Sequence, residues 1–306
     1  MIMVNRRRFL TGAGALAAGG AGLGGYASVV EAGMRLDLTR YDVASPNWPA
    51  ELPLKIAVLA DIHACEPWMP AERIGAIVDL ANAQKPDLTV LLGDFAGRQH
   101  LVSRYVPPGA WAEQLARLEA PLGVYAVLGN HDWWSAAMPT DPPDDSRSIR
   151  AALLDARIPV LENTAVALSH DGRPFWLVGL GDQLAHRWGR YVTHGSDDLG
   201  RALREINNDA PAILLAHEPF IFPKVPDRVA LTLCGHTHGG QVRLPIVGAP
   251  FIPTMHGVKR YAYGLYSEGA RRLVVSAGLG TSQLPVRFLC PPEVVCVSLG
   301  GGQAAA

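Results

Sequence analysis

Apolar positions in the first half of the chain alternate between two patterns. Short apolar runs, each of which predicts a buried strand, occupy 54–60, 87–92 and 123–128. Between them, apolar residues recur at three- and four-residue intervals, which predicts helices over 71–83 and 111–118. Strands that alternate with helices pair in parallel, so this half predicts an α/β sheet.

The second half has a different pattern. Residues 160–168 and 175–180 predict an antiparallel pair of strands around Asp171-Gly172. A helix is expected over 196–207, with Ser196 as its N-cap. Further strands are expected at 212–216, 229–234, 273–277 and 294–299, and residues 301–306 are expected to form a flexible tail.

The N-terminus carries paired arginines before an uncharged stretch. Arg6-Arg7-Arg8-Phe9-Leu10 leads into a Gly- and Ala-rich segment that carries no charge up to Val30. This arrangement resembles a twin-arginine export signal, and we expect residues 1–32 to be a signal peptide or an uncleaved anchor. Small-residue cleavage sites lie near Ala27 and Ala32. A basic, flexible tail is the alternative interpretation.

Composition excludes several classes of protein. Of 306 residues, 49% are hydrophobic, which is too many for a disordered chain. The 27 Lys and Arg against 28 Asp and Glu leave no basic excess, so no nucleic-acid partner is expected. Four cysteines are too few for a disulfide scaffold.

Polar residues follow five of the predicted strands. Ligands bind at the carboxyl ends of strands in open α/β sheets, so these residues should meet at one edge. Mixed carboxylate, amide and imidazole ligation suits Mn²⁺, Fe²⁺ or Zn²⁺ better than Ca²⁺. Each pattern alone is weak evidence, since a lone Asp-x-His is more often a surface turn. All five patterns occur here in order: Asp61-x-His63, Gly93-Asp94, Gly129-Asn130-His131-Asp132, His217 and Gly235-His236-Thr237-His238. Alternate residues of an extended segment point the same way, so Asp61 and His63, like His236 and His238, should face one point.

These five blocks resemble the signature of the calcineurin-like metallophosphoesterases over residues 53–300. The resemblance implies a four-layer α/β/β/α sandwich of two mixed sheets, and two divalent metal ions as cofactors. It also implies that one ion is held by Asp61, His63, Asp94 and His238. The second ion would be held by Asp94, Asn130, His217 and His236, with Asp94 bridging the two.

The resemblance also implies a chemistry, which is hydrolysis of phosphoesters by a metal-bridging hydroxide. His131 would be the acid or charge stabiliser at the leaving oxygen. Asp132 would keep the His131 ring protonated and oriented. Relatives carry a further polar residue after the Gly-Asp block, whereas this chain reads Phe95-Ala96-Gly97. The candidate substrate contacts are therefore Arg98 and His100, with Trp133 beside the catalytic block.

The substrate is expected to be a phosphodiester or pyrophosphate. The Pro-rich apolar stretch 244–253 suggests a lipid-linked substrate or contact with a membrane surface, although packing against the sandwich explains it equally well. The signal predicts the twin-arginine export machinery as a partner, and a location in the periplasm or on the outer face of the cytoplasmic membrane. The alternatives are a broad-specificity phosphomonoesterase and a catalytically silent metal-binding protein.

Overall fold

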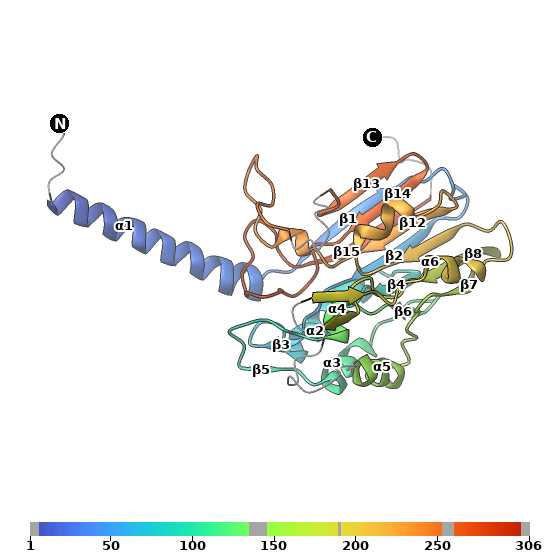
Figure 1. Cartoon of the computed structure of the whole chain (residues 1–306), viewed down its shortest axis with the longest axis horizontal. Coiled ribbons are helices and arrows are strands. Elements are labelled where there is room, and N and C mark those ends of the chain that lie inside the picture. The colour runs from blue at the N-terminus through green and yellow to red at the C-terminus, as the bar shows by residue number, and fades with distance from the viewer. Residues whose placement is uncertain (1–5, 135–145, 189–190, 253–259, 301–306) are drawn as a thin grey trace.

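Two mixed β-sheets pack face to face in the computed structural model, and helices cover their outer faces (Figure 1). The structure describes residues 6–134, 146–188, 191–252 and 260–300. The expected tail at 301–306 lies outside these ranges. The predicted four-layer α/β/β/α sandwich is confirmed.

The first sheet has the strand order β1-β15-β2-β4-β6. Its parallel part is formed by β2 (Leu54–Leu59), β4 (Leu88–Leu91) and β6 (Val124–Ala126). The strand β15 (Glu293–Leu299) runs antiparallel to β2 and parallel to β1 (Asp37–Val43). The edge strand β1 thus precedes residue 53, where the phosphoesterase domain was expected to start.

The second sheet has the order β13-β14-β12-β11-β8-β7. Its four central strands are parallel, and a hairpin partner closes each edge. The strand bounds are β7 (Thr164–His170), β8 (Arg173–Gly179), β11 (Ala212–Leu215), β12 (Val229–Cys234), β13 (Gly264–Glu268) and β14 (Arg271–Val275). Two small ribbons lie outside the sheets: β3 (Cys65–Glu66) with β5 (Arg104–Tyr105), and β9 (His186–Trp188) with β10 (Tyr191–His194).

The alternation of side chains along β2 explains the layers. Ile56 and Val58 face the second sheet and belong to the core between the sheets. Ala57 and Leu59 face the opposite way, toward the helices α2 (Ala71–Ala83), α3 (Pro108–Leu115) and α5 (Ser146–Asp155). The outer face of the second sheet is covered by α6 (Leu199–Arg204) and the 3₁₀-helix η2 (Pro219–Lys224).

The helix expected from Ser196 begins later than predicted. The first helical residue of α6 is Leu199, and the Asp198 carboxylate accepts the hydrogen bond from the Arg201 amide. Ser196 lies outside the helix, two residues before the N-cap position that Asp198 occupies, and its amide donates to the Asp182 carbonyl at 2.7 Å. Sequence reasoning chose the wrong cap because both residues are good N-cap formers.

The N-terminal helix α1 (Arg6–Gly25) extends away from the sandwich (Figure 1). It continues into a short π-helical segment, η1 (Tyr26–Glu31), which enters the body of the protein. Within the described part of the chain, no helix combines the length and apolarity needed to cross a membrane.

Candidate metal centre

The predicted ligand residues come from both sheets. Asp61, Asp94 and Asn130 lie just beyond the carboxyl ends of the parallel strands β2, β4 and β6. His217 follows β11, and His236 and His238 follow β12 of the second sheet. Because the carboxyl ends of these strands meet at one edge of the sandwich, side chains as far apart in the chain as Asp61 and His238 come together there.

The backbone at the centre differs from the extended segments that the sequence suggested. Several candidate ligand residues have a positive φ, in the left-handed region that non-glycine residues rarely occupy. They are Asp61 (53°), His63 (47°), Asp94 (55°), His236 (69°) and His238 (51°). Asp61 and His63 converge as predicted, and so do His236 and His238. The cause differs, because a tight left-handed turn after each of these two strands directs the side chains inward, whereas the prediction relied on the alternation of side chains along an extended chain. Such strain is typical of functional sites.

The first cluster of donors contains Asp61, His63, Asp94 and His238. One ligand atom from each lies within 4.8 Å of every other, and all four side chains are buried. The Nε2 atoms of His63 and His238 face each other at 3.1 Å, and Nε2 of His63 is 3.4 Å from Oδ2 of Asp94. Electron-pair donors converge here on one point, which fits a cation between them.

The second cluster is centred on His217. Its Nε2 lies 3.2 Å from the amide oxygen of Asn130, 3.3 Å from Nδ1 of His236 and 3.3 Å from Oδ2 of Asp94. The other ring nitrogen of His217 is 2.6 Å from the Leu92 carbonyl oxygen, so Nδ1 donates and leaves Nε2 free for a cation. The same Asp94 oxygen therefore reaches both clusters.

The electrostatics of these side chains match a site for divalent cations. Burial raises the pKa of Asp61 to about 7 and lowers the pKa of His236 to about 3. Burial also opposes the charge on Asp94, but His217 and His131 offset it and hold the Asp94 pKa well below its usual value. Burial also disfavours the charge on His217, but Asp94, Glu218 and Asp61 together raise the His217 pKa well above normal. A bound cation would replace the proton on His217.

Asp132 has different partners from those expected. Its carboxylate accepts hydrogen bonds from the amides of Asp94 (2.9 Å), Phe95 (2.8 Å), Ala96 (3.1 Å) and Gly129 (2.9 Å). It thereby ties together the two loops that carry Asp94 and Asn130. No hydrogen bond to the His131 ring appears among the described residues, so Asp132 fixes loops and does not orient that ring.

His131 lies beside both clusters. Its backbone amide donates to Oδ1 of Asp94 at 2.8 Å, and its ring packs edge-on against His63. Burial lowers the pKa of His131 to about 3, so the ring is neutral at pH 7 rather than protonated as expected. Its Nδ1 is buried and has no hydrogen-bond partner within the described ranges.

The three candidate substrate contacts lie in different environments. The Arg98 guanidinium donates to the carbonyl of Trp134 and acts electrostatically on His131, which places it next to the centre. His100 is exposed, and its amide donates to the Gln283 carbonyl. Trp133 packs on the helical side of the first sheet, with the Arg150 guanidinium over its ring.

Sequence reasoning missed two buried carboxyl groups beside the second cluster. Glu218 brings a carboxylate oxygen within 4.8 Å of ring nitrogens of His217 and His236. Burial raises the pKa of Glu218, and it raises that of the neighbouring Asp182 well above normal. The only sequence signal was the position of Glu218 directly after His217 in an apolar segment.

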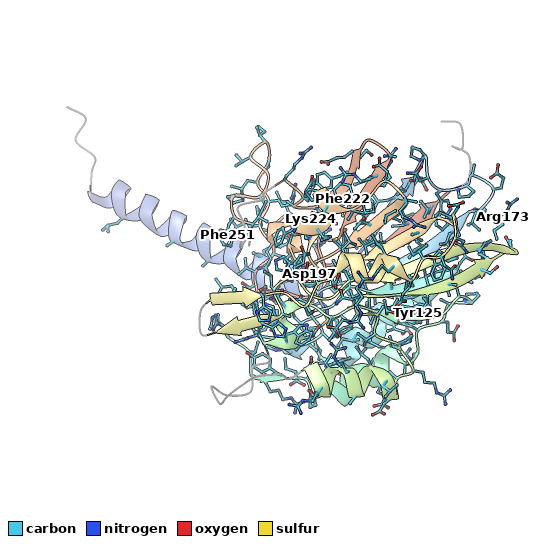
Figure 2. The ribbon with its side chains drawn as sticks, turned by 45° about the vertical axis from the view of Figure 1, so that its right-hand side comes forward. Tyr125, Arg173, Asp197, Phe222, Lys224 and Phe251 are labelled. Carbon is cyan, nitrogen blue, oxygen red and sulfur yellow. The ribbon has the colours of Figure 1, made fainter. Side chains whose placement is uncertain are left out.

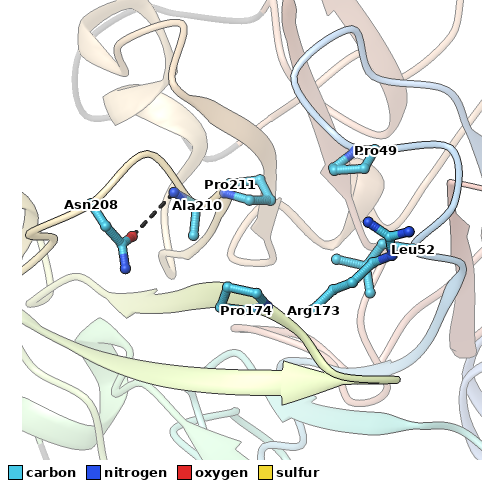
Figure 3. Close-up of a pocket in the computed structure, with 7 residues that line it drawn as sticks. All are labelled: Pro49, Leu52, Arg173, Pro174, Asn208, Ala210 and Pro211. Atoms are coloured by element: carbon cyan, nitrogen blue, oxygen red, sulfur yellow. Dashed lines mark hydrogen bonds between the residues drawn. The ribbon is translucent and has the colours of Figure 1, made fainter.

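A separate pocket lies at the opposite end of the molecule from α1, where Arg173 is labelled (Figure 2). It has a volume of about 360 Å³, and Figure 3 shows its lining. The residues around it are Pro49, Leu52, Arg173, Pro174, Asn208, Ala210 and Pro211. This lining contains no carboxylate or imidazole, so it does not compete with the centre as a metal site.

Comparison with known proteins identifies the family. The family model for the calcineurin-like phosphoesterases matches residues 54–240. The chain is 34% identical over 298 residues to the phosphodiesterase YaeI of Escherichia coli (strain K12), covering 97% of this chain and 100% of that protein. It is 32% identical to the metallophosphoesterase YkuE of Bacillus subtilis (strain 168), covering 98% and 99% of the two chains.

The solved structure of the phosphopantetheinyl hydrolase of Mycobacterium tuberculosis is also similar, with a TM-score of 0.43 and 13% identity. That match covers 75% of this chain and 89% of the other. On the strength of the family model and the relatives, the chain belongs to the calcineurin-like phosphoesterase family and is a metal-dependent phosphoesterase.

Proposed function

We propose that this protein hydrolyses phosphoesters with two divalent cations held by the two clusters. Asp61, His63, Asp94 and His238 would hold one cation. Asp94, Asn130, His217 and His236 would hold the other. The observation that carries the proposal is the position of Oδ2 of Asp94, which lies 3.4 Å from Nε2 of His63 and 3.3 Å from Nε2 of His217. One carboxylate oxygen thus serves both clusters.

Each group of the chain has a separate task in this proposal. Two cations bound side by side would supply an activated water and neutralise the charge of the phosphoryl oxygens. Asp132 holds the Asp94 and Asn130 loops at a fixed separation through its four amide hydrogen bonds. The neutral His131 ring keeps one N–H, which would donate to an oxygen of the reacting phosphoryl group. Arg98 adds a positive charge beside it.

We favour phosphodiesters or pyrophosphates as substrates over phosphomonoesters. The E. coli relative that matches over its whole length is named a phosphodiesterase, which supports this choice. Broad phosphomonoesterase activity is the alternative. Rates at saturating Mn²⁺ distinguish the two activities. A phosphodiesterase hydrolyses an aryl diester faster, and a phosphomonoesterase hydrolyses an aryl monoester faster.

A lipid-linked substrate or a membrane surface would explain the exposed apolar loop after the last ligands. Leu244, Ile246, Val247 and Phe251 are all exposed large apolar side chains. Phe251 lies on the side of the molecule from which α1 projects (Figure 2). Exposed apolar clusters of this kind mark interaction sites.

Export by a twin-arginine route belongs to the same proposal. The paired arginines before Phe9-Leu10 support it, and the periplasm or the outer face of the cytoplasmic membrane would be the destination. Replacing Arg6 and Arg7 together by Lys should keep the protein in the cytoplasm. Unchanged export of that variant would refute the twin-arginine assignment.

Metal analysis of the purified full-length protein, coupled to a phosphoester panel, tests the activity. The panel contains an aryl diester, an aryl monoester and a pyrophosphate-linked lipid in detergent. We expect about two equivalents of Mn, Fe or Zn and faster cleavage of the diester or the lipid. Faster cleavage of the monoester would favour the alternative. Two bound ions without any hydrolysis would indicate a silent metal-binding protein.

A further inference from the structure

The segment that follows α1 is packed into the catalytic domain. Residues 17–25 of α1 are exposed, whereas Ala27, Glu31 and Ala32 are buried. The indole of Trp68 donates to the Ser28 carbonyl at 2.9 Å, and Arg73 donates to the carbonyls of Gly33 and Arg35. Residues 26–35 are therefore held by side chains of the domain.

Two hydrogen bonds connect this segment to the chain at 287–290. Oε1 of Glu31 accepts a hydrogen bond from the Cys290 amide at 2.7 Å, and the Ala27 carbonyl accepts one from the Arg287 amide at 3.0 Å. Glu31 is fully buried, and its Oε2 has no hydrogen-bond partner in the described part of the chain. A buried carboxylate needs a compensating positive charge.

Arg287 is the buried cation next to this contact. Its side chain is fully buried, and it acts electrostatically with the carboxylates of Asp61, Glu293 and, most weakly, Glu31. Cys290 connects the two side chains, since its amide donates to Glu31 and its carbonyl accepts from Arg287. The Arg287 guanidinium donates to four carbonyl groups, those of Ala277 (2.8 Å), Gly278 (3.2 Å), Gly280 (2.9 Å) and Cys290 (3.0 Å). Arg287 thus fixes the shape of the turn at 277–280.

That turn supports the first cluster of ligands. The Gly280 amide donates to the Asp61 carbonyl at 2.7 Å, and a Cβ on Gly278 would lie 2.7 Å from Cβ of Asp61. Nη2 of Arg287 is also 3.4 Å from Nδ1 of His238, and the Cys290 thiol is 3.4 Å from the His238 carbonyl oxygen. Asp61 and His238 therefore both contact residues whose carbonyls are hydrogen-bonded to Arg287, and His238 also contacts Arg287 itself.

We infer that Glu31 and Arg287 are a pair of positioning residues for the first cation, so that residues 26–35 remain part of the working enzyme. Any cleavage of the leader then falls before Tyr26, whereas cleavage after Ala32 would remove the Glu31 carboxylate. The inference rests on the metal centre of the proposed function. It adds a role for a segment whose sequence resembles part of an export signal.

Stepwise Mn²⁺ titration of full-length Glu31→Ala, monitored by calorimetry, tests the pair. We expect one of the two Mn²⁺ equivalents to bind about 10–100-fold more weakly, the range typical of groups that support metal ligands. Glu31→Gln keeps an acceptor for the Cys290 amide but lacks the charge, so it should recover part of that affinity. Glu113→Ala, at an exposed position on α3, is the matched control and should bind like the wild type.

The outcomes separate positioning from simple structural support. A Glu31→Ala protein that melts at a lower temperature but binds both equivalents as tightly as the wild type would overturn the inference. Should that variant fail to fold, Arg287→Lys keeps the charge and loses most of the carbonyl contacts. It should weaken the same equivalent, and unchanged affinity would again overturn the inference.

The N-terminus of the mature protein gives an independent test. Intact mass of the protein recovered from its cellular location should show that Glu31 is retained. A chain that begins after Ala32 and binds two Mn²⁺ with full affinity would contradict the inference. A wild-type protein that binds no metal would overturn the proposed function and this inference together, whereas the results above would overturn the inference alone.

Discussion

His63 and His238 place their Nε2 atoms 3.1 Å apart, although 175 residues separate them along the chain. Both rings are fully buried, and burial lowers the pKa of each, so neither takes up a second proton at neutral pH. Nδ1 of His63 is 3.0 Å from the Ala96 carbonyl oxygen and donates to it, which leaves Nε2 as a lone-pair donor. Two neutral rings that face each other in this way are arranged for a shared cation.

Removal of divalent cations should lower the thermal stability of the protein. A ligand that binds only the folded state adds about 2.7 kcal/mol when its concentration is 100 times its dissociation constant. Chelation withdraws this contribution and leaves buried donors facing one another. Differential scanning calorimetry with excess EDTA should show a lower Tm that Mn²⁺ restores. An identical Tm with and without the chelator would contradict the metal centre.

Asp94→Ala should remove both cations. Oδ2 of Asp94 lies close to His63 in one cluster and to His217 in the other, so no single-site loss is expected. Loss of a residue that only hydrogen-bonds to a metal ligand lowers activity by roughly 10–100-fold. Asp94 is itself a candidate ligand, so its removal should lower activity by more than that. Elemental analysis of the purified variant is the measurement, with exposed Asp155→Ala as the control. Two retained equivalents would refute the bridging role.

The strand ends could be predicted because their signal is local. Apolar runs that end in polar residues identify β2, β4 and β6, and the geometry of parallel sheets brings their carboxyl ends to one edge. The ligands Asp61, Asp94 and His217 follow such runs, so their assembly required no knowledge of tertiary contacts.

The remaining features depend on contacts between distant parts of the chain. The left-handed backbone at Asp61 is held by the turn at 277–280, which no local pattern announces. Glu31 is the first acidic residue of the chain, and its partner amide is 259 residues away. Asp132 was expected to bond its neighbour, but the amides of Asp94 and Ala96 lie within reach of its carboxylate only after the two loops meet.

His131→Ala should separate catalysis from metal binding. The His131 ring lies against the first cluster but is not one of the converging donors, so two cations should remain bound. Loss of its N–H should lower kcat by about 10²–10³-fold, the usual contribution of one positioned hydrogen-bond donor to the transition state. Single-turnover kinetics on metal-loaded protein is the measurement, and His170→Ala at the remote β7–β8 turn is the control. Wild-type kcat with full metal content would exclude the assigned role.

Gly129→Ala should disrupt the centre through steric contact alone. Gly129 has an extended backbone that any residue can adopt, so the substitution causes no strain in φ. Its added Cβ would lie 2.6 Å from Cε1 of His217 and closer still to Oδ1 of Asp94. We expect a loss of roughly 1–3 kcal/mol in stability, typical of overpacking, and weaker binding of both cations.

Gly109→Ala is the matched control, because a Cβ at this exposed position in α3 meets no atom within 4 Å. Since Ala is the better helix former, the control should gain up to about 1 kcal/mol and keep both cations. Equal metal affinity in the two variants would show that Asp94 and His217 can separate without cost, which would contradict a preformed centre.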